Sequence, residues 1–404
     1  MKNILIAIRS IFKKGRHNVM KIVSLGIGLA VGLVLIAKVY FEQSYDDFYP
    51  DRDRVYQVWA KYQQNGGELK DYPQTSGGIA PTMQQQIPEI ETVTRYTSFG
   101  DWTFTMTDTK MKYSGRCIIA DSCFFDILPR PMLIGNAKEV LSTPMYVLIS
   151  SRIAKNIGGD VIGKNFTVDN SPGRTMTIGG VFEEVPENSH SRYDVIVSMA
   201  SAGRFMWEGS PTNMLGNDRY ISYVKLHKGV NPLALEEQVR TFVNSYFPPE
   251  EQQKVGLSID FSFHKLDNLH KELPQVKRMT WILSLLAFAL IFTAVMNYIL
   301  IVISSIVNRS KEVAVHKCYG ASENNIHGMM FGEALVHIVL SLILALLLIL
   351  AFRGTVEELL ATSLDSLLLS NGSLVLLGIC ILVFFVSGFM PGSLYARIPV
   401  ASAF

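Results

Sequence analysis

Long apolar runs and one long polar segment divide the chain. The apolar runs predict transmembrane helices at 20–40, 279–307, 329–352 and 373–390. Each run is long enough, or nearly so, to cross a hydrocarbon core of about 30 Å as a helix. The polar segment between the first two runs, residues 41–277, predicts one large domain outside the membrane. The expected fold is therefore four membrane helices with a domain inserted between the first and the second.

Strand and helix patterns occur at both ends of this polar segment. Alternating apolar residues predict strands at 54–62, 91–99, 219–227 and 257–266. Helical spacing predicts helices at 79–90 and 231–247. The domain is therefore expected to be α+β, with one strand–helix–strand unit from each end. The middle of the segment, about 100–200, is richer in short strands and turns, and predicts an inserted β-rich lobe.

Basic residues beside the apolar runs set the expected orientation. Residues 1–17 predict an amphipathic helix on the inner membrane surface, with apolar side chains on one face and basic ones on the other. The connection 308–328 is basic, whereas the connection 353–371 is mainly acidic. We therefore expect a multi-pass membrane protein, embedded in the lipid bilayer. Both termini, including residues 391–404, are expected in the cytoplasm and the large domain outside the membrane.

Composition, charge and the absence of catalytic motifs argue against some classes of function. A net charge of +2 gives no case for nucleic-acid binding. The segment GGDVIGKN (158–165) resembles the phosphate loop G-x-x-x-x-G-K-[ST], but Asn165 stands at its Ser/Thr position. A helical pattern also precedes the glycines, where a phosphate loop needs a strand. No hydrolase, zinc-protease or zinc-spaced motif is evident. We therefore expect no enzyme activity, and no metal or other cofactor bound by this chain.

Two cysteines, Cys117 and Cys123, lie in the expected exported domain. A disulfide between them is possible in that compartment. Their spacing also suits two unrelated positions, and a disulfide framework usually has more cysteines. We favour free thiols.

Five residues within the spans raise questions of packing and charge. Glu333 and His337 are four residues apart, so they share one face of the third predicted span. An acid inside a span costs roughly 2.5–3.5 kcal/mol. Either the pair is a proton-coupled site, or Glu333 lies near the inner surface beside a cation, which we favour. In the first span, Gly26, Gly28 and Gly32 would allow close packing of a partner helix.

The connection after the second span carries the most specific pattern, NRSKEVAVHKCYGASENNIHGMMFGEALVH (308–337). Gly320 suits the end of one short helix and Ser322 the start of the next. The pattern resembles the coupling loop of the FtsX-like, MacB-type permeases of ABC transporters, R-x-x-E-[IV]-x-[IV]-x-K-x-x-G-A-S. The matching residues are Arg309, Glu312, Val313, Val315, Lys317, Gly320, Ala321 and Ser322, with Glu333 after them. His316 departs from the family, which often has arginine there.

The resemblance extends over effectively the whole chain. EQSYDDFYPDRDRVYQV (42–58), FFDILPRPMLIGN, IGGVFEEVPENSHSRYDVIVS and MPGSLYARIPVASAF match the family in order. It implies a separate cytoplasmic ABC ATPase, which binds the ATP and magnesium, with the 308–328 loop docked on it. It also implies a dimer with a second copy or a homologous half, and an outer domain with a ferredoxin-like lobe. The location that it implies is the inner membrane, with the large domain in the periplasm. Such permeases move their outer domains without passing substrate through the membrane interior, which is called mechanotransmission.

Two functions remain open at this point. The chain is expected to be the permease subunit of an ABC transporter that exports or extracts a peptide, lipid-linked or drug-like substrate. The alternative is a transmembrane sensor or regulator whose periplasmic domain activates a cell-envelope enzyme or another periplasmic partner protein. A secondary transporter is disfavoured because the spans carry few charges besides Glu333 and His337. Relatives that share this C-terminal motif are often twice as long, so a half-size subunit and a truncated form are both considered.

Overall fold

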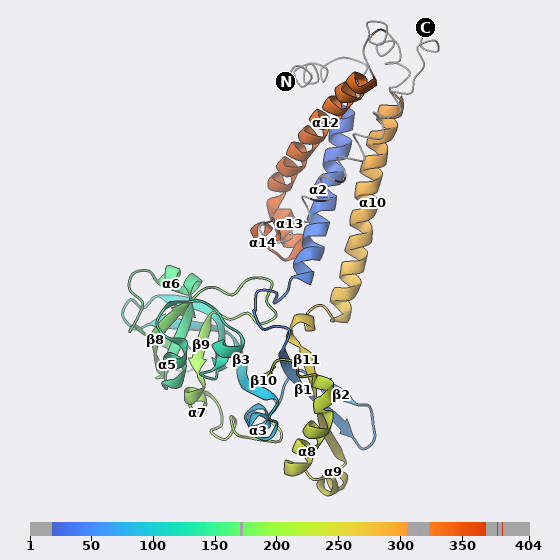
Figure 1. Cartoon of the computed structure of the whole chain (residues 1–404). Helices are drawn as coiled ribbons and strands as arrows, with labels where there is room; N and C mark the ends of the chain where they lie inside the picture. Colours follow the sequence, from blue (N-terminus) through green and yellow to red (C-terminus); the bar gives the residue numbers. More distant parts are fainter. Residues whose placement is uncertain are drawn as a thin grey trace. The chain divides into compact units, whose positions relative to one another are not determined.

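The chain forms two compact units in the computed structural model, which describes residues 18–169, 173–304, 315, 323–368, 378 and 382. The membrane unit comprises Met1–Ser44 and Leu273–Phe404, and the outer unit comprises Tyr45–Glu272. Both are drawn in Figure 1. The predicted amphipathic helix 1–17 and the C-terminal residues 391–404 lie outside the described residues. So does the predicted fourth span, apart from residues 378 and 382.

In its described part, the membrane unit contains three long helices and two short ones. They are α2 (Asn18–Gln43), α10 (Pro274–Ser304), α12 (Glu323–Ala351), α13 (Arg353–Leu360) and α14 (Leu364–Leu368). The described helices Asn18–Gln43 and Pro274–Ile301 are long and apolar enough to cross a membrane. Leu335–Ala351 and Arg353–Leu360 form a pair bent by 70°, which is a third candidate. The described residues therefore contain two or three candidate spans of the four that the sequence predicts.

The glycines of α2 lie where the helix contacts its neighbours. Helix α2 packs between α10 and α12 (Figure 1). A Cβ atom on Gly28 would overlap the Cβ of Ala294 on α10, and one on Gly32 would overlap Ile291. A Cβ on Gly26 would lie 2.9 Å from a side chain of α12. Small residues thus let these backbones approach closely within one chain. A role for them between two copies stays a prediction.

Replacing Gly28 by alanine is expected to push α2 and α10 apart, because the new methyl group would occupy the place of the Ala294 side chain. Overpacking of this kind costs about 1–3 kcal/mol. Adding Ala294→Gly to the Gly28→Ala chain should restore most of the loss. Unfolding by dodecyl sulfate in a mild detergent, followed by circular dichroism, measures both. Val31→Leu, at a residue of α2 that is 44% exposed, is the control. Equal stability of Gly28→Ala and the unaltered chain would contradict this packing.

Polar contacts also join the membrane helices. Asn297 of α10 donates from Nδ2 to the hydroxyl of Ser24 on α2 over 2.6 Å. Near the other end of α2, the Nζ of Lys38 lies 2.6 Å from a carboxylate oxygen of Glu42. The same Nζ donates to the hydroxyl of Thr362 over 2.7 Å. Both charged side chains of this pair are more than nine-tenths buried, so α2 is tied to the segment between α13 and α14.

The outer unit is α+β, as the sequence predicts. Its strands are β1 (Val55–Gln64), β2 (Lys70–Tyr72), β3 (Ile90–Met106), β4 (Lys112–Ala120), β5 (Met132–Ile134), β6 (Tyr146–Ser150), β7 (Asn165–Val168), β8 (Thr175–Phe182), β9 (Val195–Ser198), β10 (Ile221–Leu226) and β11 (Leu257–Lys265). Its helices are α3 (Ile79–Gln86), α4 (Phe124–Ile127), α5 (Ala137–Ser142), α6 (Ser151–Ile157), α7 (Ala202–Phe205), α8 (Glu236–Tyr246) and α9 (Pro249–Val255), with 3₁₀ turns η1 (Met199–Ser201), η2 (Pro232–Leu235) and η3 (Leu266–Asn268).

The first lobe is built from both ends of the outer unit. Its antiparallel strands stand in the order β11-β1-β10-β3, with α3 between β1 and β3 and α8 between β10 and β11 along the chain. This is the βαββαβ arrangement of a ferredoxin-like fold. Asn231 caps η2 by accepting from the backbone N–H of Leu233. Apolar residues of the strands and of both helices share one core, including Val58, Met83 and Phe242.

The second lobe is a closed barrel of six strands. β3 pairs with β4, β4 with β9, β9 with β6, β6 with β8, β8 with β7, and β7 pairs again with β3. At 17 residues, β3 is long enough to belong to both lobes. Buried side chains such as Phe104, Ile119, Val147 and Ile178 form the core of this lobe. Closure leaves these strands without a free edge over the paired residues.

The segment that resembles a phosphate loop is a turn between α6 and β7. Gly158, Gly159 and Gly163 have φ angles of 74°, 65° and 76°, a region that glycine enters without steric cost. The helix precedes the turn and the strand follows it, which reverses the order of a phosphate loop. The predicted helix–turn–strand connection is confirmed.

Both cysteines of the outer unit are free thiols, as favoured from the sequence. Cys117 is fully buried on β4, and burial raises the pKa of its thiol well above the ordinary value. The Sγ of Cys123 lies 3.1 Å from the carbonyl oxygen of Val93. A high pKa and deep burial make Cys117 unreactive.

Candidate functional site

Two segments of the outer unit connect it along the chain to the membrane helices. Residues 45–54 follow α2, and residues 266–272 precede α10. We call these two segments the junction. They are the covalent connections of the outer unit to α2 and α10.

Charged side chains tie the two junction segments together. The Nζ of Lys271 lies 2.9 Å from the carboxylate of Asp267 and 3.3 Å from that of Asp47. The Nε of Arg52 lies 3.4 Å from Asp267 and 3.8 Å from Asp47. All four side chains are partly exposed, so each single pair contributes at most about 1 kcal/mol. Because each residue has two partners, the pairs form a network that crosses from one segment to the other.

An aromatic stack joins the same two segments. The rings of Tyr45 and His270 are nearly parallel, at an angle of 6°, with their centroids 3.4 Å apart. Tyr45 is the first residue of the outer unit, and His270 lies two residues before its end. The junction is therefore fastened by a ring contact as well as by ion pairs.

Asp46 fixes the first junction segment to the rest of the outer unit. Its side chain is completely buried, and its φ of 60° is one that aspartate tolerates better than most residues. Its Oδ1 accepts from the hydroxyl of Ser189 over 3.0 Å, and its Oδ2 lies 2.7 Å from Nδ1 of His190. The Nε2 of His190 is hydrogen-bonded to the hydroxyl of Tyr223 on β10. A continuous chain of hydrogen bonds thus leads from the junction to the ferredoxin-like sheet.

The Asp267 carboxyl shows how the ion network acts on protonation. Partial burial raises its pKa. The hydrogen bond from Lys271 and the charges of Lys271 and Arg52 lower the pKa, and together they outweigh the effect of burial. The net pKa lies below the ordinary value of aspartate. The folded state therefore favours the ionised form of this carboxyl more than the unfolded state does.

The stability that Asp267 contributes is expected to be present above about pH 4 and lost at lower pH. The reason is that a depressed folded pKa favours folding only while the carboxyl is ionised. Urea unfolding of residues 45–272, measured at pH 6 and at pH 3, gives the loss. Asp267→Asn should show a smaller loss between these pH values. The same pH dependence in the Asn variant would contradict a role for this carboxyl.

The structure describes only some of the site residues predicted from the sequence. Outside the described residues lie Arg309, Glu312, Val313, His316, Lys317, Gly320, Ala321 and Ser322. Their role in coupling stays a prediction. Glu333 belongs to α12. His337, also on α12, is 2% exposed, and its ring meets that of Tyr298 on α10 edge-on at 6.3 Å. Among the described residues, no group of three or more His, Cys, Asp or Glu side chains suits a metal ion.

Sequence reasoning missed the junction. Asp46 of the junction lies in one matched motif, EQSYDDFYPDRDRVYQV, and its partner His190 lies in another, IGGVFEEVPENSHSRYDVIVS, but no pattern pairs the two. The signal that the sequence offers for this contact is an aspartate in one matched motif and a histidine in the other.

Fold and junction together define the class of protein. It is a membrane protein whose apolar helices carry one large α+β domain, fastened where the chain enters and leaves it. Two family profiles match this chain: the MacB-like periplasmic core domain over residues 20–242, and the FtsX-like permease C-terminal domain over residues 284–400. The chain belongs to the FtsX-like, MacB-type permeases of ABC transporters. The outer unit is accordingly extracytoplasmic, and ATP hydrolysis in this family is carried out by a partner ATPase.

A solved structure supports the outer-unit fold. A domain of a putative permease protein from Porphyromonas gingivalis is 33% identical, with a TM-score of 0.50, and the match covers 54% of this chain and 91% of that domain. The extracellular domain of the noncanonical ABC-type transporter YknZ from Gram-positive bacteria is 10% identical, with a TM-score of 0.37, over 52% of this chain and 98% of that one. The second likeness is too weak to carry an argument. No protein of curated function matches the sequence.

Proposed function

We propose that this permease passes conformational changes of a separate cytoplasmic ATPase to its periplasmic domain. The result would be export or extraction of a peptide, lipid-linked or drug-like substrate by mechanotransmission. The observation that carries the proposal is the junction. Its two segments are fastened to each other by the Tyr45–His270 stack and the ion network, and to the ferredoxin-like sheet through Asp46. A displacement of either connecting helix would then move the domain as a whole.

The length of α10 also supports transmission of force. Its 31 residues form one continuous helix, which spans about 46 Å at 1.5 Å per residue. A hydrocarbon core of about 30 Å needs only two thirds of that length. The helix therefore either tilts strongly or projects beyond the core, and a projecting helix would act as a rigid lever.

The cytoplasmic end of this pathway is proposed to be the 308–328 loop. Glu312 and Lys317 would give charged contacts to the ATPase, and Gly320 would set the turn that presents them. The permease is proposed to work as a dimer, with a second copy or a homologous half.

Co-purification with a candidate ATPase tests the proposal. The unaltered chain is expected to retain the ATPase. The double variant Glu312→Lys/Gly320→Pro is expected to lose it, with roughly a tenfold or larger fall in bound ATPase activity, because the charged contact and the turn are both removed. Asn325→Ala, in the same loop but outside the residues that match the family, is the control for a small change. If no ATPase binds, or if binding survives the double variant, the loop does not couple this chain to ATP. The role of sensor or regulator would then replace that of transporter.

A further inference from the structure

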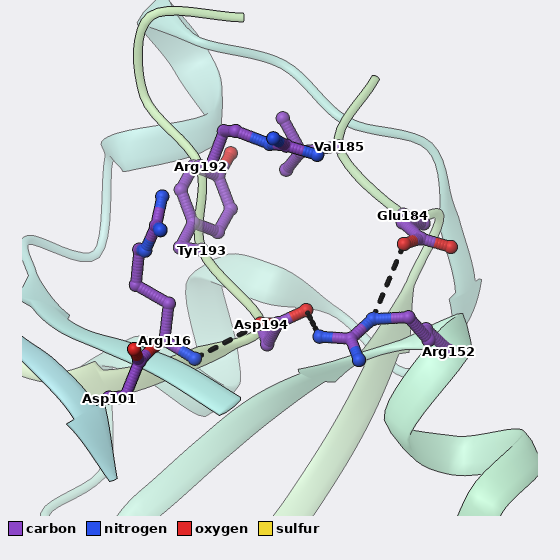
Figure 2. Close-up of a pocket in the computed structure, with 8 residues that line it drawn as sticks. All are labelled: Asp101, Arg116, Arg152, Glu184, Val185, Arg192, Tyr193 and Asp194. Carbon is purple, nitrogen blue, oxygen red and sulfur yellow. Dashed lines mark hydrogen bonds and ion pairs between the residues drawn. The ribbon is translucent and has the colours of Figure 1, made fainter. Parts of the chain in front are cut away.

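A polar cavity of about 390 Å³ opens on the barrel lobe. Three arginines and three acids line it: Arg116, Arg152, Arg192, Asp101, Glu184 and Asp194. They come from separate parts of the lobe, since Arg116 lies on β4, Arg152 on α6, and Arg192 just before β9. Figure 2 shows the three arginine side chains on different sides of the hollow. None of these residues belongs to the junction.

One of the three arginines is already neutralised. The guanidinium of Arg152 lies 2.6 Å from the carboxylate of Asp194 and 3.3 Å from that of Glu184 (Figure 2). Asp194 also accepts from the backbone N–H of Arg116 over 3.0 Å. Asp194 is therefore held in place from two sides. Both of these acids are engaged with Arg152, so they offer little charge to the other two arginines.

The other two arginines lack such partners. Within the described part of the chain, no carboxylate lies within 4.0 Å of the guanidinium of Arg116 or Arg192. Asp101 stands directly opposite Arg116 in the pairing of β3 with β4, yet forms no ion pair with it in the described structure. Around Arg116 and Arg192 there are thus two positive charges and one negative charge. Both side chains line the cavity and are exposed to solvent, so their guanidinium groups are accessible to a bound anion.

We infer that this cavity binds a monoanionic oxyanion, a carboxylate or a phosphodiester, between Arg116 and Arg192. The planar fork of a guanidinium donates two parallel hydrogen bonds to either group. A ligand with a single negative charge is favoured, because the charges of the three arginines and three acids that line the cavity add up to zero. The carboxylates would repel a dianion more strongly. The volume admits a small headgroup or the end of a side chain, not a folded partner. The site goes beyond the proposed function and depends neither on the ATPase nor on the junction.

Binding is tested with two small monoanions on the full chain in a maltoside micelle, which contains no phosphate. N-Acetylglycine represents a carboxylate and dimethyl phosphate a phosphodiester. N-Acetylglycinamide and trimethyl phosphate are their neutral analogues. Saturation-transfer NMR is expected to show binding of at least one anion and of neither neutral analogue. The anion that binds better identifies the chemical source of the natural ligand. Absence of binding by both anions would overturn the inference.

Substitutions assign the binding to the cavity. Arg116→Gln and Arg192→Gln are each expected to weaken binding about tenfold, because each removes a charge-assisted contact. Lys155→Gln removes the same charge from an exposed position of α6 that does not line the cavity, and should leave binding unchanged. Arg192→Lys keeps the charge without the fork and should bind with intermediate affinity, which gives a test should a Gln variant fold poorly. Unchanged binding in both Gln variants would overturn the inference. If only one Gln variant folds, unchanged binding in that variant and in Arg192→Lys would overturn it as well.

Discussion

The Arg95→Met substitution is expected to lower the free energy of unfolding of the outer unit by about 3 kcal/mol. Arg95 lies on β3, and its Nε is 3.2 Å from the carboxylate of Asp121. Its Nη1 donates to the carbonyl oxygens of Gly77 and Pro211, so one side chain ties three segments together. Methionine would leave Asp121 as a poorly compensated charge. We expect the lower end of the usual range, because the Asp121 side chain is 19% exposed.

A second substitution, at Asp121, distinguishes the effect of the buried charge from the effect of lost packing. Burial raises the pKa of the Asp121 carboxyl, although Arg95 acts to lower it. In Arg95→Met this pKa should rise further, so the loss of stability should grow as the pH rises above about 4. Adding Asp121→Asn removes the charge and should recover part of the loss. Urea unfolding of residues 45–272, followed by tryptophan fluorescence, measures both variants. If the double variant is no more stable than Arg95→Met, the charge is not the cause.

The Asp46→Ala substitution is expected to cost about 3 kcal/mol, the second large effect. It removes the acceptor of the Ser189 and His190 contacts from a completely buried position. A lost hydrogen bond to a charged group costs about 1.5–3 kcal/mol. Alanine also tolerates the φ of 60° less well than aspartate. The same unfolding experiment on residues 45–272 measures the change.

Asp46→Asn is the matched control, because asparagine keeps the shape, one acceptor oxygen and the tolerance of this backbone conformation. It should cost about 1 kcal/mol, the loss of charge assistance alone. Hydrogen exchange at the backbone of residues 188–191 should rise in Asp46→Ala and change little in Asp46→Asn. Equal costs for the two variants would contradict the role assigned to the carboxylate contacts.

Local periodicity predicted most elements of the ferredoxin-like lobe. The alternation in 54–62 and the helical spacing in 79–90 correspond to β1 and α3, since a buried face imposes the pattern directly. Closure of the barrel could not be predicted in this way. It depends on pairing Phe104 with Val168 across 64 residues, and such a register leaves no local pattern.

The segment predicted as a loop at 353–371 contains α13 and α14, where Val356 and Leu360 keep helical spacing.

The candidate sites differ in how far the sequence alone predicts them. The 308–328 loop is one continuous motif, so resemblance alone predicts it. The junction depends on side chains that are far apart in sequence, such as Asp47 and Lys271. The arginine cavity likewise combines β4, α6 and the segment before β9. Only a folded structure brings such residues together.

The most direct test of the central claim is whether the periplasmic domain moves when the partner ATPase turns over. A spin label at Lys254→Cys, on exposed helix α9 of a chain without its four native cysteines, reports the distance between two copies by double electron–electron resonance. Addition of ATP and magnesium to the complex is expected to shift the distance distribution. In the junction variant Asp47→Asn/Lys271→Met the shift should shrink while ATP hydrolysis continues. An unchanged distribution in the unaltered complex during ATP hydrolysis would contradict the account.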